Sequence, residues 1–173
     1  MSRQYPPLAI TEYWSRLNDT ILDLVDYIPD DKLDWSPREG LWNFRGIVLH
    51  MALARNNWME RDVQDGLALG AGPAAAPGGE TLEERTQAFL RHGRTKDELK
   101  DHLRWSWDRL LRFLSDPAKL DMAYAGTDPD DAERTFDGHW IAFHGLEHDV
   151  HHRADLFHYL ALLGVDHPEI GTP

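Results

Sequence analysis

The sequence predicts an all-α protein, a four-helix bundle with a short extra helix and long loops. Four long stretches repeat their apolar residues every three or four positions, which is the periodicity of amphipathic helices. No stretch has a convincing strand pattern, and no internal repeat is visible. Because 173 residues suffice for one full core and are too few for two ordinary domains, we predict a single domain over residues 1–173.

Two helices are predicted in the first part of the chain. The first ends at Pro29 and carries one apolar stripe, made of Ile10, Trp14, Leu17, Ile21, Val25 and Ile28. The second begins after Asn43, a favourable N-cap residue, and runs to about Gly66. Its inner face holds Ile47, Met51, Ala54 and Trp58.

The middle of the chain combines a flexible connection with two capping boxes. Residues 66–80, rich in glycine, alanine and proline, are predicted to be a surface loop. In the pairs Thr81/Glu84 and Thr95/Glu98, the threonine side chain can accept a hydrogen bond from the backbone amide three residues on. The glutamate side chain can in turn accept one from the backbone amide of the threonine. The first pair predicts a short helix to about His92. The second predicts a long helix with the stripe Leu99, Leu103, Trp107, Leu110 and Leu114.

A long acidic connection precedes the last helix. Residues 116–138 hold seven acidic and two basic side chains, a composition typical of a solvated loop. The last helix is predicted from about Gly138 to Leu163. Gly164 stands where a left-handed C-cap is expected, and Pro168 follows.

Composition and charge exclude several classes of function. The formal charge of −12 argues against nucleic-acid binding, which relies on Lys and Arg to neutralise phosphates. No apolar run approaches the roughly 20 residues of a membrane span, and no signal peptide is visible, so we expect no membrane partner and a cytoplasmic location. The sequence has no cysteine, so any metal must rest on His, Asp or Glu.

The histidines are the strongest functional signal. Six of the ten fall between His139 and His158. His144, His148 and His152 are spaced by four, so they share one face of the last helix, together with apolar or aromatic residues that turn this face inward. Two imidazoles at this spacing can bind one ion, but a site that does chemistry normally has three protein ligands and an open position.

His50 is the best candidate for the third ligand, because it lies beside the apolar face of the second helix. A core histidine or a boundary histidine would also fit there, yet the ladder of inward histidines favours a ligand. His148 belongs to either pair in the ladder, and the spacing leaves His144 and His152 as alternatives. The remaining histidines are expected to have surface, supporting or ordinary roles: His92, His102, His139, His151, His158 and His167.

Three carboxylates lie near the histidines. Glu147 and Asp149 are each about 100° around the helix from His148, so we expect both to face solvent. Asp155 is better placed to act near a metal. The segment from His148 to His152 also resembles the H-E-x-x-H zinc-protease pattern with aspartate in place of glutamate, but no second feature of such proteases is present. The glutamates of a di-iron bundle are missing as well.

Three stretches together resemble the DinB/YfiT superfamily of metal-binding bundles: Trp42–His50 (WNFRGIVLH), His148–Arg153 (HDVHHR) and Tyr159–Gly164 (YLALLG). The resemblance implies a four-helix bundle with one divalent ion on His50, His148 and His152, and so prefers His152 to His144. The superfamily includes mycothiol-dependent maleylpyruvate isomerases, bacillithiol S-transferases and proteins called metal-dependent hydrolases. This chain has Ala154-Asp155 where the family often has Gly-Gln, so Asp155 could orient His152 or alter the substrate end of the pocket.

Three functions follow as expectations. The first is a metal-dependent transferase that joins a low-molecular-weight thiol to an electrophilic small molecule in stress or detoxification, with Arg153 contacting the thiol's carboxylate. The second is a hydrolase with a metal-activated water and Asp155 as catalytic base. The third is a non-enzymatic stress-associated metal-binding or dimerising module, for which Trp105 or Trp107 would mark a partner surface. Imidazole ligands suit zinc or nickel, with iron also open, and a homodimer is left open.

Overall fold

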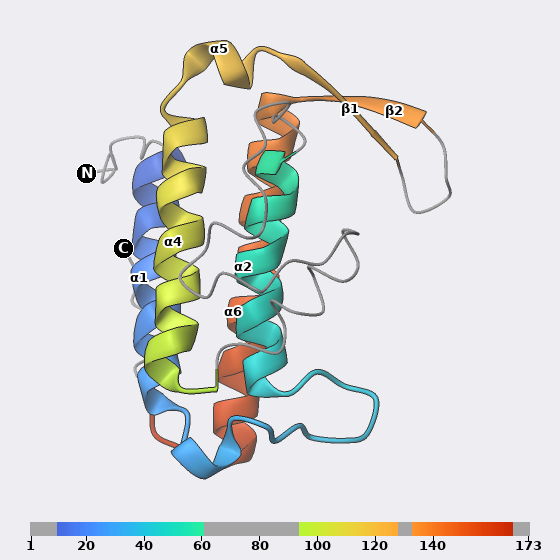
Figure 1. The fold of residues 1–173 in the computed structure, drawn as a ribbon. Coiled ribbons are helices and arrows are strands. Elements are labelled where there is room, and N and C mark those ends of the chain that lie inside the picture. The colour runs from blue at the N-terminus through green and yellow to red at the C-terminus, as the bar shows by residue number, and fades with distance from the viewer. Residues whose placement is uncertain (1–9, 61–93, 128–132, 168–173) are drawn as a thin grey trace, which may run out of the picture.

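The computed structural model describes residues 10–60, 94–127 and 133–167. Four long helices run side by side: α1 (Ile10–Tyr27), α2 (Phe44–Glu60), α4 (Lys96–Leu114) and α6 (Gly138–Leu162) (Figure 1). Both α1 and α2 contact α4 and α6, so the four helices close a ring around a shared core. The predicted all-α four-helix bundle is confirmed. The single domain over residues 1–173 stays a prediction, because it includes residues outside the described ranges.

Helix boundaries follow the signals in the sequence. The Asn43 side chain accepts a hydrogen bond from the Gly46 amide at 2.7 Å, at the start of α2. Thr95 and Glu98 form the predicted capping box of α4. At the end of α6, Gly164 has a φ of +67°, the left-handed conformation that a glycine adopts without steric cost.

Some predictions fall on residues that the structure does not describe. These are the loop at 66–80, the capping box at Thr81 and the short helix to His92. The second helix is described as far as Glu60, and the Trp58 side chain is outside the description.

The prediction of a strandless acidic loop at 116–138 is wrong. This segment contains the short helix α5 (Pro117–Leu120) and the antiparallel strands β1 (Ala123–Thr127) and β2 (Glu133–Asp137), which extend from one end of the bundle (Figure 1). Asp116 caps α5 by accepting from the Ala118 amide at 3.0 Å. In β1, Tyr124 is buried and pairs with Phe136 of β2. One aromatic on each short strand anchors the hairpin despite its acidic composition.

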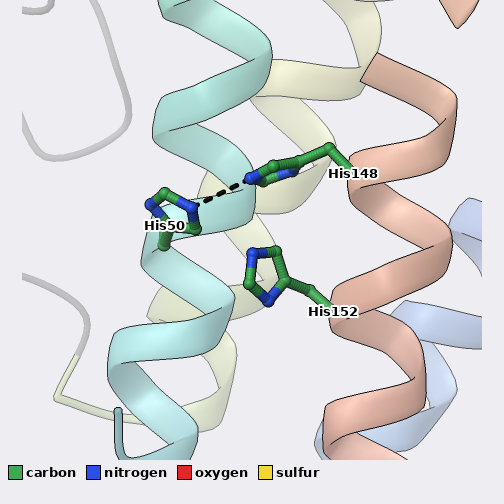
Figure 2. Close-up of side chains that lie close together, drawn as sticks. All are labelled: His50, His148 and His152. Carbon is green, nitrogen blue, oxygen red and sulfur yellow. Dashed lines mark hydrogen bonds between the residues drawn. The ribbon is translucent and has the colours of Figure 1, made fainter. Parts of the chain in front are cut away.

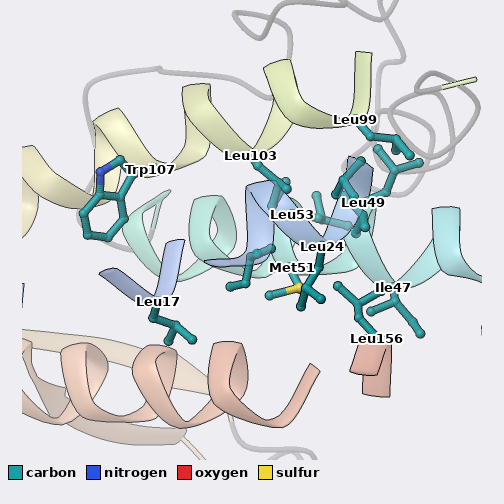
Figure 3. Packing of buried hydrophobic residues seen from close by; sticks show 14 of the residues in the cluster. Leu17, Leu24, Ile47, Leu49, Met51, Leu53, Leu99, Leu103, Trp107 and Leu156 are labelled. Atoms are coloured by element: carbon teal, nitrogen blue, oxygen red, sulfur yellow. The ribbon is translucent and has the colours of Figure 1, made fainter. Parts of the chain in front are cut away.

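The core lies between the four long helices. Aliphatic side chains from α1, α2, α4 and α6 interdigitate there (Figure 3), among them Leu17, Leu24, Ile47, Met51, Leu103 and Leu156. These positions repeat at helical spacing, so burying one stripe from each helix removes a continuous apolar surface from water. None of the described helices is long and apolar enough to cross a membrane.

Candidate metal centre

Three partly buried histidines meet between α2 and α6. His50 lies on α2, and His148 and His152 lie one turn apart on α6, with their rings turned toward one another (Figure 2). One ring nitrogen from each lies within 4.8 Å of the others. These are the three residues favoured from the sequence, and each lies on the helix predicted for it.

The rings are in direct contact. His50 Nε2 and His148 Nε2 are 2.9 Å apart, a hydrogen-bond distance at which one ring donates and the other accepts. The ring centroids of His50 and His152 are 4.9 Å apart, and those of His148 and His152 are 4.5 Å apart. The His148 and His152 side chains are 18% and 16% exposed, so the group is shielded but reachable from solvent.

Burial favours the neutral form of two of these imidazoles, His50 and His152. It is the main cause that lowers the pKa of His50 to about 4, and the nearby His148 and His152 rings lower it further. Burial and His148 also lower the pKa of His152, although Asp155 opposes that shift. Only a neutral imidazole has a lone pair to give a metal, so near neutral pH these two rings are in the form that binds.

Asp155 lies behind His152. Its Oδ2 is 3.0 Å from His152 Nδ1, within hydrogen-bond distance, and 3.7 Å from His151 Nε2. A carboxylate on one ring nitrogen fixes the tautomer, so that the other nitrogen carries the lone pair. His151, His152 and Asp155 form a second group of potential ligands, but all three come from one helix and the His151 side chain is 71% exposed.

The expectation that Asp149 faces solvent is wrong. Asp149 is fully buried, and its Oδ2 accepts from Trp14 Nε1 at 2.6 Å and from Arg55 Nε at 2.9 Å. The Arg55 guanidinium also donates to Asn18 at 2.9 Å. The 100° step from His148 thus turns Asp149 toward α1 and α2, not toward water. An arginine in the apolar stretch of α2 was the available signal, since a buried arginine requires an acidic partner.

A glycine lets this network form. A Cβ on Gly145 would lie 2.9 Å from the Trp14 ring, so only glycine allows the indole to lie against α6. The Trp14 indole then reaches Asp149, which lies one turn after Gly145 on α6. One face of α6 therefore anchors the helix in the bundle, and the adjacent face carries the candidate ligands.

The remaining candidates lie around the three-histidine group. His144 is outside it and stacks on Trp140, with ring centroids 4.8 Å apart. Glu147 is exposed, as expected, and so are His139, His151 and His158. Arg153 is half-buried, and its Nε makes no hydrogen bond within the described part of the chain.

Sequence reasoning gave no role to Trp42, whose ring contacts the ring of His50 with centroids 4.2 Å apart. Trp42 was part of the stretch that carried the family resemblance, but it precedes the helix, so its position could not be obtained from helical spacing.

The donor set fits a divalent transition-metal ion. Three imidazoles from two helices are the nitrogen ligands that zinc, nickel and iron accept, and three protein ligands leave a further coordination position for another molecule. His152 also has the outer carboxylate partner that metal-bound histidines commonly have.

The fold and the histidine group together define a class of protein. It is the class of helical bundles in which one divalent ion could join two neighbouring helices. The sequence profile of the DinB family matches residues 1–173, and the chain belongs to the DinB family. The resemblance inferred from the sequence is confirmed at this level.

Solved structures agree on the fold. A DinB-like protein from Bacillus subtilis is 17% identical, with a TM-score of 0.59 over 94% of this chain and 95% of that one. A protein described as a DinB family member from Exiguobacterium sibiricum is 20% identical, with a TM-score of 0.65 over 95% of this chain and 99% of that one. A DinB-like protein from Bacillus cereus is 13% identical, with a TM-score of 0.63 over 94% and 95%. Comparison with curated proteins gave no match.

Proposed function

We propose that this protein binds one divalent metal ion through His50, His148 and His152. In this proposal the metal activates a low-molecular-weight thiol for transfer to an electrophilic small molecule. The observation that best supports the proposal is the convergence of three shielded histidines, from two helices, at ring-contact distances. We expect zinc or nickel, with iron as the alternative, because imidazole nitrogen suits all three.

The proposed chemistry needs little from the chain itself. A divalent ion at the site would supply a positive charge that lowers the pKa of a coordinating thiol. The thiol proton passes to solvent, the sulfur forms a bond to an electrophilic carbon, and the displaced group leaves with the bonding electrons. The thiol comes from the cosubstrate, which agrees with a sequence that contains no cysteine. We assign Arg153 to a carboxylate of that thiol, since guanidinium pairs well with carboxylates.

Asp155 is better placed to orient His152 than to act as a catalytic base. In the hydrolytic alternative, a nearby carboxylate would accept a proton from the metal-activated water. Asp155 was the predicted base, but its hydrogen-bond contact with His152 Nδ1 supports a role in orienting that ring. A thiol with a lowered pKa can lose its proton directly to buffer, so transfer does not require a protein base.

Metal analysis of protein purified without a histidine tag tests the site. We expect about one divalent ion per chain in the unaltered protein and a large loss of metal in His50→Ala. The matched control is His158→Ala, because His158 lies on α6 but is exposed and outside the group. Unchanged metal content in His50→Ala would refute the assignment of the ligands.

Turnover tests the reaction separately. Chelator-treated and metal-loaded protein are compared with a bacillithiol-type thiol and chlorodinitrobenzene, whose thioether product is followed by absorbance. We expect conjugation above background only in the loaded protein, with His158→Ala equally active. Ester hydrolysis without thiol would favour the hydrolase, and metal binding with neither activity would favour a non-enzymatic module.

A further inference from the structure

A pocket of about 360 Å³ lies at the start of α2. It is lined by Leu41, Trp42, Asn43, Arg45, Gly46 and Leu49. Its volume is in the range of small-molecule sites, which is about 300–1,000 Å³. Leu41 and Trp42 are 40% and 46% exposed, so a ligand in the pocket would remove apolar surface from water.

Trp42 connects the pocket with the candidate metal centre. Its indole lines the pocket and meets the His50 ring edge to face, with centroids 4.2 Å apart. Gly46 leaves room for the Asn43 cap, because a Cβ there would lie 3.0 Å from Asn43 Oδ1, whereas its 3.5 Å distance to Trp42 Cε3 would be an ordinary contact. A molecule packed on the indole would therefore lie one aromatic ring away from His50.

The pocket is polar on one side. Arg45 lines it, and the guanidinium donates from Nε to Asp34 Oδ1 at 2.8 Å. The Arg45 side chain is 26% exposed and the Asp34 side chain is 69% exposed, so the carboxylate can turn toward water when another anion meets the guanidinium. A held guanidinium next to an apolar wall suits a flat hydrocarbon group that carries a carboxylate.

We propose that this pocket binds the apolar end of the small-molecule substrate, and that the substrate belongs to the aromatic carboxylates. Trp42 stacks on the ring and Arg45 meets the carboxylate. That the bound molecule is the substrate rests on the proposed function, but its binding in the pocket does not depend on a metal. The pocket and the proposed function can therefore be refuted independently.

Calorimetric titration with 1-naphthoate tests the proposal on both chelator-treated and metal-loaded protein. We expect saturable binding of one molecule per chain in both states. Trp42→Ala should weaken it about tenfold, since the stacking surface is lost. Arg45→Gln should weaken the binding of naphthoate to a similar degree. It should leave the binding of 1-naphthalenemethanol, which has no charge, nearly unchanged.

Trp140→Ala is the matched control. Trp140 is 41% exposed and stacks on a histidine, His144, but it does not line the pocket. The Trp140→Ala variant should bind naphthoate as tightly as the unaltered protein does. Thermal unfolding, followed by circular dichroism, verifies that each variant is folded. Absence of saturable binding, or equal loss in the Trp140 and Trp42 variants, would overturn the proposal. If the unaltered protein binds naphthoate but takes up no divalent ion when metal is added, the proposed function is overturned and the pocket stands.

Discussion

At the scale of single residues, His50 occupies a position that a bundle helix normally gives to an apolar side chain. Its neighbours Leu49 and Met51 are buried, and its ring is held by His148, His152 and Trp42. Three adjacent imidazoles cannot all carry a proton without strong mutual repulsion. The group therefore favours neutral rings, or a cation that replaces the protons.

The pKa of His50 predicts how the metal-free protein responds to acid. Because the folded-state pKa is about 4 and the ordinary value is 6.5, the unfolded chain binds more protons than the folded one between these values. The contribution of His50 to the free energy of unfolding should therefore be constant above about pH 6.5 and fall as the pH drops toward 4. The urea midpoint of chelator-treated protein, measured from pH 4.5 to 7.5, gives this dependence. His50→Gln should make the urea midpoint depend less on pH. An identical pH dependence in the two proteins would contradict the lowered pKa of His50.

Asp155 gives a second prediction at this scale. Asp155→Ala removes the carboxylate from His152 Nδ1, and losing such an outer partner typically costs roughly 10–100-fold in metal affinity. Asp155→Asn should lose less, since its amide oxygen can still accept the hydrogen bond. Affinity is measured by competition with a chelating metal indicator. Glu147→Ala is the control, because Glu147 is exposed on the same helix, and equal affinity in the two alanine variants would contradict the assigned role.

At the scale of elements, α6 carries two adjacent faces with different tasks. Asp149 ties it through Arg55 to α2 and through Trp14 to α1. His148, one residue earlier, faces His50. The network fixes the rotation of α6 about its axis, because turning Asp149 toward its partners leaves His148 turned toward α2.

This network predicts a large loss of stability. Asp149→Ala leaves the Arg55 guanidinium buried without its ion pair, and breaking a buried pair in this way typically costs about 3–5 kcal/mol. Asp101→Ala is the control, because it breaks an exposed pair with Arg104 on α4, and such pairs contribute less than about 1 kcal/mol. Chemical denaturation measures both. Similar losses in the two variants would show that the buried pair does not anchor α6.

The sequence predicted the elements unevenly, for physical reasons. Long helices have periodic stripes and local caps, so α1, α4 and α6 were located nearly to their ends. The hairpin was missed because its order depends on Tyr124 packing at the end of the bundle and donating to Lys119, contacts that no local pattern contains. Likewise, helical spacing placed His148 beside either His144 or His152, and the family resemblance selected His152. Only packing of α2 on α6 could turn Asp149 inward and bring Trp42 to His50.

At the scale of the whole molecule, a metal at the proposed site would join α2 to α6 across nearly a hundred residues of sequence. Binding that occurs only in the folded state stabilises it, by about 2.7 kcal/mol when the free metal is 100 times Kd. For a chain of this size that corresponds to a rise in Tm of roughly 5–10 °C. Scanning calorimetry of chelator-treated protein, before and after addition of zinc, measures the shift. His50→Ala should show little of it, although its α6 ligands remain. An equal rise in both proteins would mean that the ion binds elsewhere, with the group of His151, His152 and Asp155 as the first place to look.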